Sequence, residues 1–382
     1  MVDALILLTS ITVVLVAALI ATIVSQKLKI PSQLLLFLLG VLLFYSSYAG
    51  QPIVQLGTDL LSSISIVALI LIIFEATSRI KFLKSDSITK DATAFFIVSL
   101  VLNTVLLSYV GHALELEWFA AIMLALLMSC VEFSVIFQRH HIPKNKVTQF
   151  LHDESNISCA FVLVIPFLII SFLQASPVSL LSNVVSFSIS LFAGVGAGVL
   201  IGLIMFKMLH FKKFERFALI ITSVAALVAY TLAQRIDGNG VVAVATLGLI
   251  FGNVFIKQKQ MINAQVHNAY TALEALLFTI VGATIGIPLT LEFLIVSLSF
   301  FVFYLVFRFA AVQFLFKEFD FYQRTEIALF APKGLATIAI AFALLNYTFA
   351  GSGLIVQYLS AVFVYSLIFD TILAKSGVYK HR

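Results

Sequence analysis

The chain consists of long apolar segments separated by short polar ones, and this pattern restricts it to a membrane fold. Of its 382 residues, 62% are hydrophobic and only 11% are charged. A soluble chain of this length could not bury so much apolar surface, whereas a run of about 20 apolar residues crosses a bilayer as a helix. The sequence therefore predicts an all-α polytopic protein of the cell membrane, surrounded by the lipid bilayer.

Thirteen segments are apolar and long enough to cross the bilayer as helices. They cover residues 3–25, 33–49, 59–78, 92–113, 118–138, 154–174, 178–206, 217–234, 240–256, 268–287, 291–316, 325–346 and 354–374.

Lys and Arg residues are concentrated in alternate loops. One set of loops, together with the C-terminus, holds 20 of the 23 basic residues, and the other set holds only Arg235. Because cytoplasmic loops carry the excess of Lys and Arg, the N-terminus is expected outside and the C-terminus in the cytoplasm. The regular alternation also supports the count of thirteen, since a missed helix would break it.

Thirteen spans divide into two groups of six around a central one, and the two groups run in opposite directions. We expect one transmembrane domain over residues 1–382, with a first inverted repeat at 1–175, a linker helix at 176–210 and a second repeat at 211–382. Inverted repeats are typical of secondary transporters, which bind their substrates near the midplane on interrupted helices.

The matching interruptions are expected in the fifth and twelfth spans. The twelfth contains Pro332, Lys333 and Gly334, which predict a broken helix carrying a cation. The fifth contains no Pro or Gly, so its break rests on the repeat alone. A simple kink in the twelfth span is the alternative.

Four of the charged residues inside predicted spans stand out, because an unpaired charge at the bilayer centre costs roughly 2.5–3.5 kcal/mol. Glu132 and Glu154 are expected to converge with Arg308 and Lys333, with Glu154 held by one of the two cations. The alternative is that Asp153 and Glu154 are first-turn acids favoured by the helix dipole. We prefer that alternative for Asp153 only.

Other acids near span ends have local interpretations. Glu75 is expected to pair with Arg79 one helical turn later. Glu274 either lines a cavity or caps the entry of its span, and Asp370 could pair with Lys375 or reach a vestibule.

Several function classes have no support. The chain has no phosphate-binding loop, nucleotide fold or metal motif, so we expect no ATP-driven pump, no cofactor, no resident metal and no catalytic residues of an enzyme. The net charge of +5 is spread over the loops and does not indicate a nucleic-acid partner.

Local patterns along the whole chain, in order, resemble the monovalent cation:proton antiporter superfamily, the sodium/proton and Kef-type exchangers. The stretches that carry the resemblance are LKIPSQLLLFLLGVLL, IIFEATSRIKF, RHHIPKNKVTQFLHDES, NGVVAVATLGLIFGN, FVFYLVFRFAAV and FAPKGLATIAIAFAL. The resemblance implies two inverted six-helix repeats with discontinuous helices that cross at the midplane. It also implies a homodimer that exchanges Na⁺ or K⁺ for H⁺ by alternating access.

The chain departs from the family where the ions bind. The family's fifth span carries Thr-Asp, and that position corresponds to Ser129-Cys130 here, within a residue. Its sixth span carries Glu-Ser followed by Asn-Asp or Asp alone, which correspond here to Glu154-Ser155 and Ser158-Cys159. The resemblance thus implies that the chain's only two cysteines replace the ion-binding aspartates, and that Lys333 replaces an arginine.

A neutral thiol is a poor ligand for a hard cation, which prefers oxygen. The expected ion- and proton-binding set comprises Glu132, Glu154, Ser129, Cys130, Ser155, Asn156, Ser158 and Cys159, with Arg308 and Lys333 as charge-pairing residues. Glu132 lies two residues after Cys130, about 200° around a regular helix. It could therefore replace the lost acid if the span is unwound or the register differs.

Three functions remain open at this point. The first is a working cation/proton antiporter that uses Glu132 and Glu154. The second is a transport-deficient relative that serves as a sensor or partner subunit. The third is a thiol site, in which Cys130 and Cys159 bind a soft metal or form a redox-gated disulfide.

Overall fold

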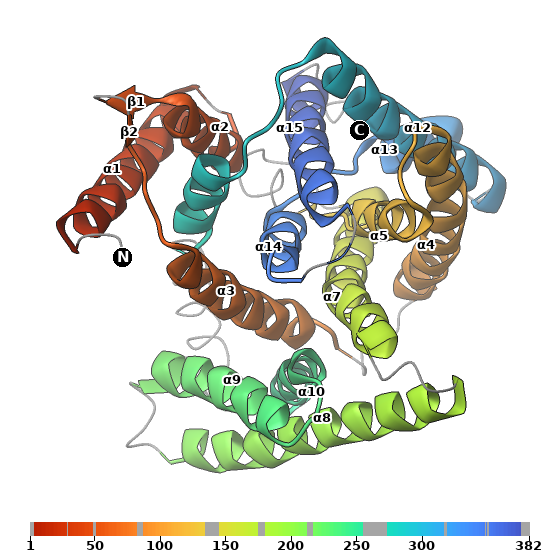
Figure 1. The fold of residues 1–382 in the computed structure, drawn as a ribbon. Helices are drawn as coiled ribbons and strands as arrows, with labels where there is room; N and C mark the ends of the chain where they lie inside the picture. The colour runs from red at the N-terminus through yellow and green to blue at the C-terminus, as the bar shows by residue number, and fades with distance from the viewer. Residues whose placement is uncertain are drawn as a thin grey trace. The chain divides into compact units, whose positions relative to one another are not determined.

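The computed structural model describes residues 4–28, 30–48, 51–81, 87–133, 145–174, 180–211, 217–254, 273–316, 319–347, 349 and 351–375. The regular secondary structure in these ranges is helical, apart from a short hairpin in which β1 (Ser47–Tyr48) pairs with β2 (Gln51–Pro52) (Figure 1). The all-α polytopic fold class is confirmed.

The described helices match the thirteen predicted spans in order. Eight are long and apolar enough to cross a bilayer: α1 (Ala4–Leu28), α3 (Thr58–Ser78), α4 (Ser87–Ala113), α7 (Lys146–Gln174), α8 (Leu180–Leu209), α9 (Ala218–Arg235), α12 (Leu291–Leu315) and α15 (Ser352–Lys375). Five are apolar but shorter: α2 (Ser32–Tyr45), α5 (Trp118–Met128), α10 (Gly240–Asn253), the helix Leu273–Thr284 and α14 (Leu335–Leu344). The polar helix α13 (Phe321–Leu329) precedes α14.

The chain forms two compact units. The first comprises Met1–Ser65, Asp86–Ser158 and Leu273–Arg382, and the second comprises Ile66–Ser85 and Cys159–Ala272. Helices α3 and α7 each contribute to both units. The predicted division at residues 175 and 210 into inverted repeats and a linker helix stays a prediction.

In the first unit, α15 packs against α2, α5, α12 and α14, and α4 packs against α5 and α12. Aromatic side chains fill the core near α4 and α7, among them Phe95, Phe133 and Phe150. Glycine permits one very close helix contact, because a Cβ on Gly40 of α2 would lie 2.9 Å from the backbone of Gly282. Glu274, at the entry of the helix Leu273–Thr284, accepts a hydrogen bond from Gln33.

In the second unit, α8, α9 and α10 pack against one another as a three-helix group (Figure 1). The end of α3 belongs to this unit and approaches α10 at glycine, since a Cβ on Gly252 would lie 3.0 Å from the carbonyl carbon of Ser78. The predicted pair of Glu75 and Arg79 is confirmed, with Arg79 Nε donating to Glu75 Oε1 over 2.6 Å.

Helix α7 begins two turns earlier than the predicted sixth span. Its first residue is Lys146, because Asn145 provides an N-terminal cap whose Oδ1 accepts the Thr148 N–H over 2.9 Å. The alternative that Asp153 and Glu154 are first-turn acids is therefore wrong. Asp153 accepts a hydrogen bond from the Thr89 hydroxyl over 2.8 Å.

Both predicted helix breaks are present. Helix α5 ends at Met128, and the backbone from Cys130 to Glu132 has no helical structure. The predicted fifth span extends to residue 138, beyond the described residues. In the twelfth span, α13 ends at Leu329 and α14 starts at Leu335, so the Pro332-Lys333-Gly334 segment is extended and not a simple kink.

Candidate ion site

The two broken segments meet inside the first unit. The Glu132 N–H donates a hydrogen bond of 2.8 Å to the Pro332 carbonyl. We call residues 129–133 the first break and residues 330–334 the second break. Both Glu132 and Lys333 are buried, with exposed fractions of 5% and 0%. The contact therefore places one acid and one base at the meeting point of two interrupted helices.

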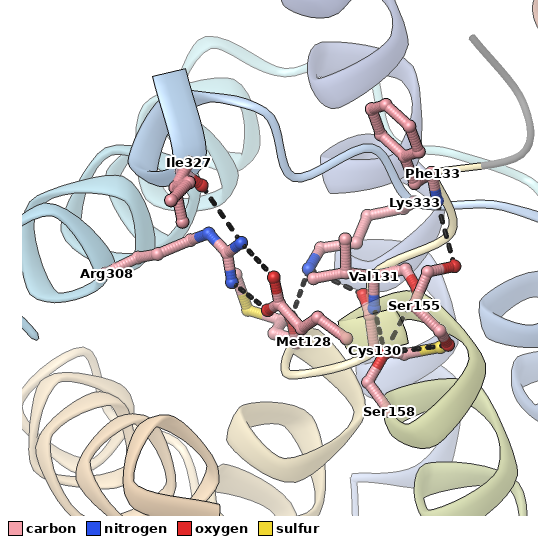
Figure 2. A network of polar contacts seen from close by, with 10 residues as sticks. Met128, Cys130, Val131, Phe133, Ser155, Ser158, Arg308, Ile327 and Lys333 are labelled. Carbon is pink, nitrogen blue, oxygen red and sulfur yellow. Dashed lines mark hydrogen bonds and ion pairs between the residues drawn. The ribbon is translucent and has the colours of Figure 1, made fainter. Parts of the chain in front are cut away.

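Two serines of α7 hold the backbone of the first break. Ser158 Oγ accepts the Val131 N–H over 3.2 Å and donates to the Val131 carbonyl over 3.1 Å. Ser155 Oγ accepts the Phe133 N–H over 3.0 Å. Figure 2 shows both serines pointing from α7 to the unwound chain. These bonds replace the helical ones that Val131 and Phe133 lack, which explains how the span breaks without Pro or Gly.

Lys333 binds the C-terminal end of α5. Its ammonium donates to the Met128 carbonyl and, over 2.8 Å, to the Cys130 carbonyl (Figure 2). The ammonium also lies 3.8 Å from the centre of the Tyr304 ring. The last carbonyls of a helix lack partners within it and carry partial negative charge, so they stabilise a cation.

Glu132 binds the N-terminal end of α14. Its Oε2 accepts the Ala336 N–H over 3.1 Å. Gly334 makes room for this carboxylate, because a Cβ there would lie 2.7 Å from the Glu132 Cβ. The N-terminal end of a helix carries partial positive charge and stabilises an anion.

Each broken helix thus provides the charged group that binds the end of the other. Lys333 of the second break binds the end of α5, and Glu132 of the first break binds the start of α14. This reciprocal arrangement lowers the cost of both charges at membrane depth. Glu132 was expected to replace the lost acid only if the fifth span is unwound. The chain is unwound from Cys130 to Glu132, so this condition is met.

Glu154 forms a two-fold ion pair with Arg308 of α12. Arg308 Nη1 donates to Glu154 Oε1 over 2.5 Å and Nη2 donates to Oε2 over 2.7 Å. Both side chains are almost completely buried. Nη2 also reaches the Ile327 carbonyl of α13 over 3.1 Å, so one guanidinium joins α7, α12 and α13 (Figure 2). Of the two cations considered for Glu154, the structure selects Arg308.

The other predicted oxygen ligands have different contacts. Ser129 Oγ donates back to the Ala125 carbonyl of α5 over 3.2 Å. The Asn156 side chain lies within 3.1 Å of His152, on a more exposed side of α7 than Ser155 and Ser158. The structure therefore brings Glu132, Ser155 and Ser158 to the breaks and leaves the Asn156 amide away from them.

Cys130 and Cys159 are both buried and neither belongs to a disulfide, so the redox-gated disulfide is not formed in the described structure. The other form of the thiol hypothesis, a soft metal bound by the two cysteines, stays a prediction. Across the described ranges, no group of three or more His, Cys, Asp or Glu residues is arranged to hold a metal ion.

Sequence reasoning missed two residues around the second break, Tyr304 and Ser366, and for Asp370 it considered Lys375 or a vestibule and not this break. Tyr304 lies one turn before Arg308 on α12, and its ring contacts Lys333. Ser366 Oγ of α15 accepts the Lys333 N–H over 3.1 Å, and Asp370 follows one turn later. The i,i+4 spacing of these polar residues along two apolar helices is the signal that would have revealed them.

Comparison with known proteins agrees with this geometry. The family model for the transmembrane sodium/hydrogen exchanger matches residues 14–378. The chain belongs to the sodium/hydrogen exchanger family. This is a family of transporters and not of enzymes, and membership supports cation/proton exchange by a multi-pass membrane protein. No curated protein sequence matches the chain significantly.

Solved structures of another exchanger share the fold. The sodium proton antiporter MjNhaP1 from Methanocaldococcus jannaschii at pH 8 is similar with a TM-score of 0.73 and 16% sequence identity, covering 98% of this chain and 99% of that one. An electron-microscopy structure of the same antiporter gives a TM-score of 0.74 at 16% identity, covering 99% of this chain and 98% of that one. At this identity the likeness shows the fold alone.

Proposed function

We propose that this chain is a secondary transporter that exchanges a monovalent cation, Na⁺ or K⁺, for H⁺ by alternating access. It acts as a homodimer in the cell membrane, with the N-terminus outside and the C-terminus in the cytoplasm. The observation that carries the proposal is the buried carboxylate of Glu132, bound to the start of α14 at the meeting point of the two breaks.

Glu132 is the principal ion- and proton-binding group in this proposal. A proton and a cation neutralise the same carboxylate, so binding of one excludes the other, and a single carboxylate suffices for obligatory exchange. The Ser129 hydroxyl serves as a further oxygen ligand, the kind that hard cations prefer. Cys130 and Cys159 belong to the proposed site but provide no oxygen ligand from their side chains.

Glu154 has a second role in the proposal. Both of its oxygens bind Arg308, so it carries an ion or proton only in a state in which that pair opens. Until then, the pair fixes α7, and with it Ser155, Ser158 and Asn156, relative to α12.

The test is cation-dependent proton flux in proteoliposomes containing the purified chain. We expect Glu132→Gln to lower Na⁺- or K⁺-driven flux about ten-fold or more, because the amide cannot release a proton. Glu292→Gln is the matched control, since Glu292 is an exposed first-turn acid of α12 and its loss should leave flux unchanged. Unchanged flux in both Glu132→Gln and Glu154→Gln would contradict the proposal.

One observation favours a second candidate, a transport-deficient sensor or partner subunit. Each buried glutamate already has a structural use, Glu132 at the start of α14 and Glu154 with Arg308. Native chain that gives no flux at any pH, beside Cys130→Asp or Cys159→Asp variants that do, would support this candidate over exchange.

A further inference from the structure

Asp370 is a buried acid that the proposed mechanism does not use. It lies in α15 and is 1% exposed. Among the described residues, neither of its carboxylate oxygens has a hydrogen-bond partner. The side chain of Lys375, the partner considered from the sequence, lies outside the described residues. An acid this deeply buried is rarely left without a hydrogen bond or a counter-ion, so its position needs a reason.

Asp370 faces the second break. Ser366 lies one turn before it on α15 and accepts the Lys333 N–H. Lys333 and Arg308, together with the backbone of Ala331, are the groups that act electrostatically on the Asp370 carboxylate. One face of α15 therefore presents a hydroxyl and then a carboxylate to the non-helical segment between α13 and α14.

The elements packed against α15 contribute several other titratable groups. Helix α12 contributes Arg308 and Tyr304, with Glu292 at its far end, and the second break contributes Lys333. Helices α5 and α14 contain none, and α2 contains only Tyr45. Helix α13, whose Ile327 and Ala328 lie in the hydrophobic cluster at the end of α15, contributes Tyr322, Arg324 and Glu326, and the helix Leu273–Thr284 contributes Glu274. Lys333 and Arg308 are the charged groups that act on Asp370.

Neither of these cations forms an ion pair with Asp370. The two terminal nitrogens of Arg308 bind the two carboxylate oxygens of Glu154, and the Lys333 ammonium is bound to the neutral carbonyls of Met128 and Cys130 and to the Tyr304 ring. In the described part of the chain, no ion pair joins Lys333 to any carboxylate. A buried anion without a partner is costly, so the arrangement favours a neutral Asp370 while Lys333 stays on α5.

We propose that Asp370 is a second proton-carrying residue of the exchange cycle, one that replaces a carboxylate lost at the cysteine positions. In the state described here, it holds its proton. When it releases that proton to water, its O–H bond breaks and the resulting carboxylate pairs with the Lys333 ammonium, which then leaves the carbonyls of α5. This inference rests on the proposed exchange function.

The position of Asp370 suits this role. It lies five residues before the end of α15 at Lys375, about 8 Å along the helix axis. A proton therefore has a short distance to travel between the carboxyl group and the aqueous side at that end of the span.

The test compares native chain with Asp370→Asn and Asp370→Glu, and uses Asp59→Asn as the matched control. Asp59 is an exposed first-turn acid of α3. Two measurements are made on each purified protein: infrared difference spectra of the carboxyl C=O stretch across a pH titration, and cation-dependent proton flux in proteoliposomes.

We expect native chain to show a protonated-carboxyl band that titrates, and we expect Asp370→Asn alone to lose it. Flux should fall about ten-fold or more in Asp370→Asn and recover with a shifted pH profile in Asp370→Glu. Because Asn resembles a protonated Asp in shape and charge, Asp370→Asn should fold normally. Failure of that variant to fold would show that the carboxylate is needed as an anion and would overturn the inference.

The remaining outcomes separate this inference from the proposed function. Normal exchange with an unchanged band and unchanged flux in Asp370→Asn would overturn the inference and leave exchange intact. Absence of exchange in native chain would overturn the proposed function and with it the transport role of Asp370.

Discussion

At the scale of single residues, the strongest constraint in the described structure is the ion pair of Glu154 and Arg308. Removing one member of a buried pair leaves the other charge without a partner, which costs about 3–5 kcal/mol. We therefore expect Arg308→Met to lower the free energy of unfolding by about that amount, because Glu154 would remain buried and unpaired. Chemical unfolding in detergent, followed by tryptophan fluorescence or circular dichroism, measures the loss.

A partly exposed pair provides the control. Arg79 pairs with Glu75 one turn away on α3, and the two side chains are 32% and 10% exposed, so Arg79→Met should cost less than Arg308→Met. Adding Glu154→Gln to Arg308→Met should recover part of the loss, since the uncompensated charge is gone. A double variant no more stable than Arg308→Met would show that packing, and not charge, is responsible.

The charged residues of the site could be located from the sequence, but their partners could not. A charge inside an apolar span needs a partner wherever it lies, so hydropathy alone singles out Glu132, Glu154, Arg308 and Lys333. Whether Glu154 meets Arg308 or Lys333 depends on how α7, α12 and the second break pack. That contact spans more than 150 residues of chain, and no local pattern specifies it.

At the scale of elements, Gly334 is the residue that allows the two breaks to meet. An added Cβ would overlap the Glu132 side chain, so Gly334→Ala must displace Glu132 from the start of α14. Overpacking of this kind costs about 1–3 kcal/mol. We expect Gly334→Ala to lower both thermal stability and cation-dependent proton flux.

Gly353 of α15 is the matched control for that substitution. A Cβ at this position would meet nothing within 4 Å, so Gly353→Ala should leave stability and flux close to native. Equal effects of the two substitutions would contradict the close contact between Gly334 and Glu132.

The two breaks also show how far local sequence predicts an element. Pro332 and Gly334 predict the second break, since Pro lacks a backbone N–H and Gly disfavours a helix. The first break has no such signal, because serines on α7 and the Pro332 carbonyl hold it open from outside. Tertiary hydrogen bonds override helix propensity there, and only the expected repeat symmetry pointed to the interruption.

At the scale of the whole molecule, hydropathy and loop charge predicted the order of the helices well. Each described helix lies on a predicted span, because length and apolarity alone decide what crosses a bilayer. Helix ends were less predictable. Helix α7 starts two turns before the predicted span, because the N-terminal cap Asn145 extends the helix beyond its apolar part.

Exchange through one shared carboxylate makes a prediction for the whole transport cycle. If H⁺ and cation compete for Glu132, lowering the pH fills the carboxylate with protons and raises the cation concentration needed for half-maximal flux. While the group is mostly protonated, that concentration should rise about ten-fold per pH unit, and by linkage raising the cation concentration should drive protons off the protein equally. Initial rates in proteoliposomes, measured against Na⁺ and K⁺ separately over a pH series, test both the competition and the identity of the cation. A half-saturating concentration that does not change with pH, alongside measurable flux, would mean that proton and cation bind to separate groups.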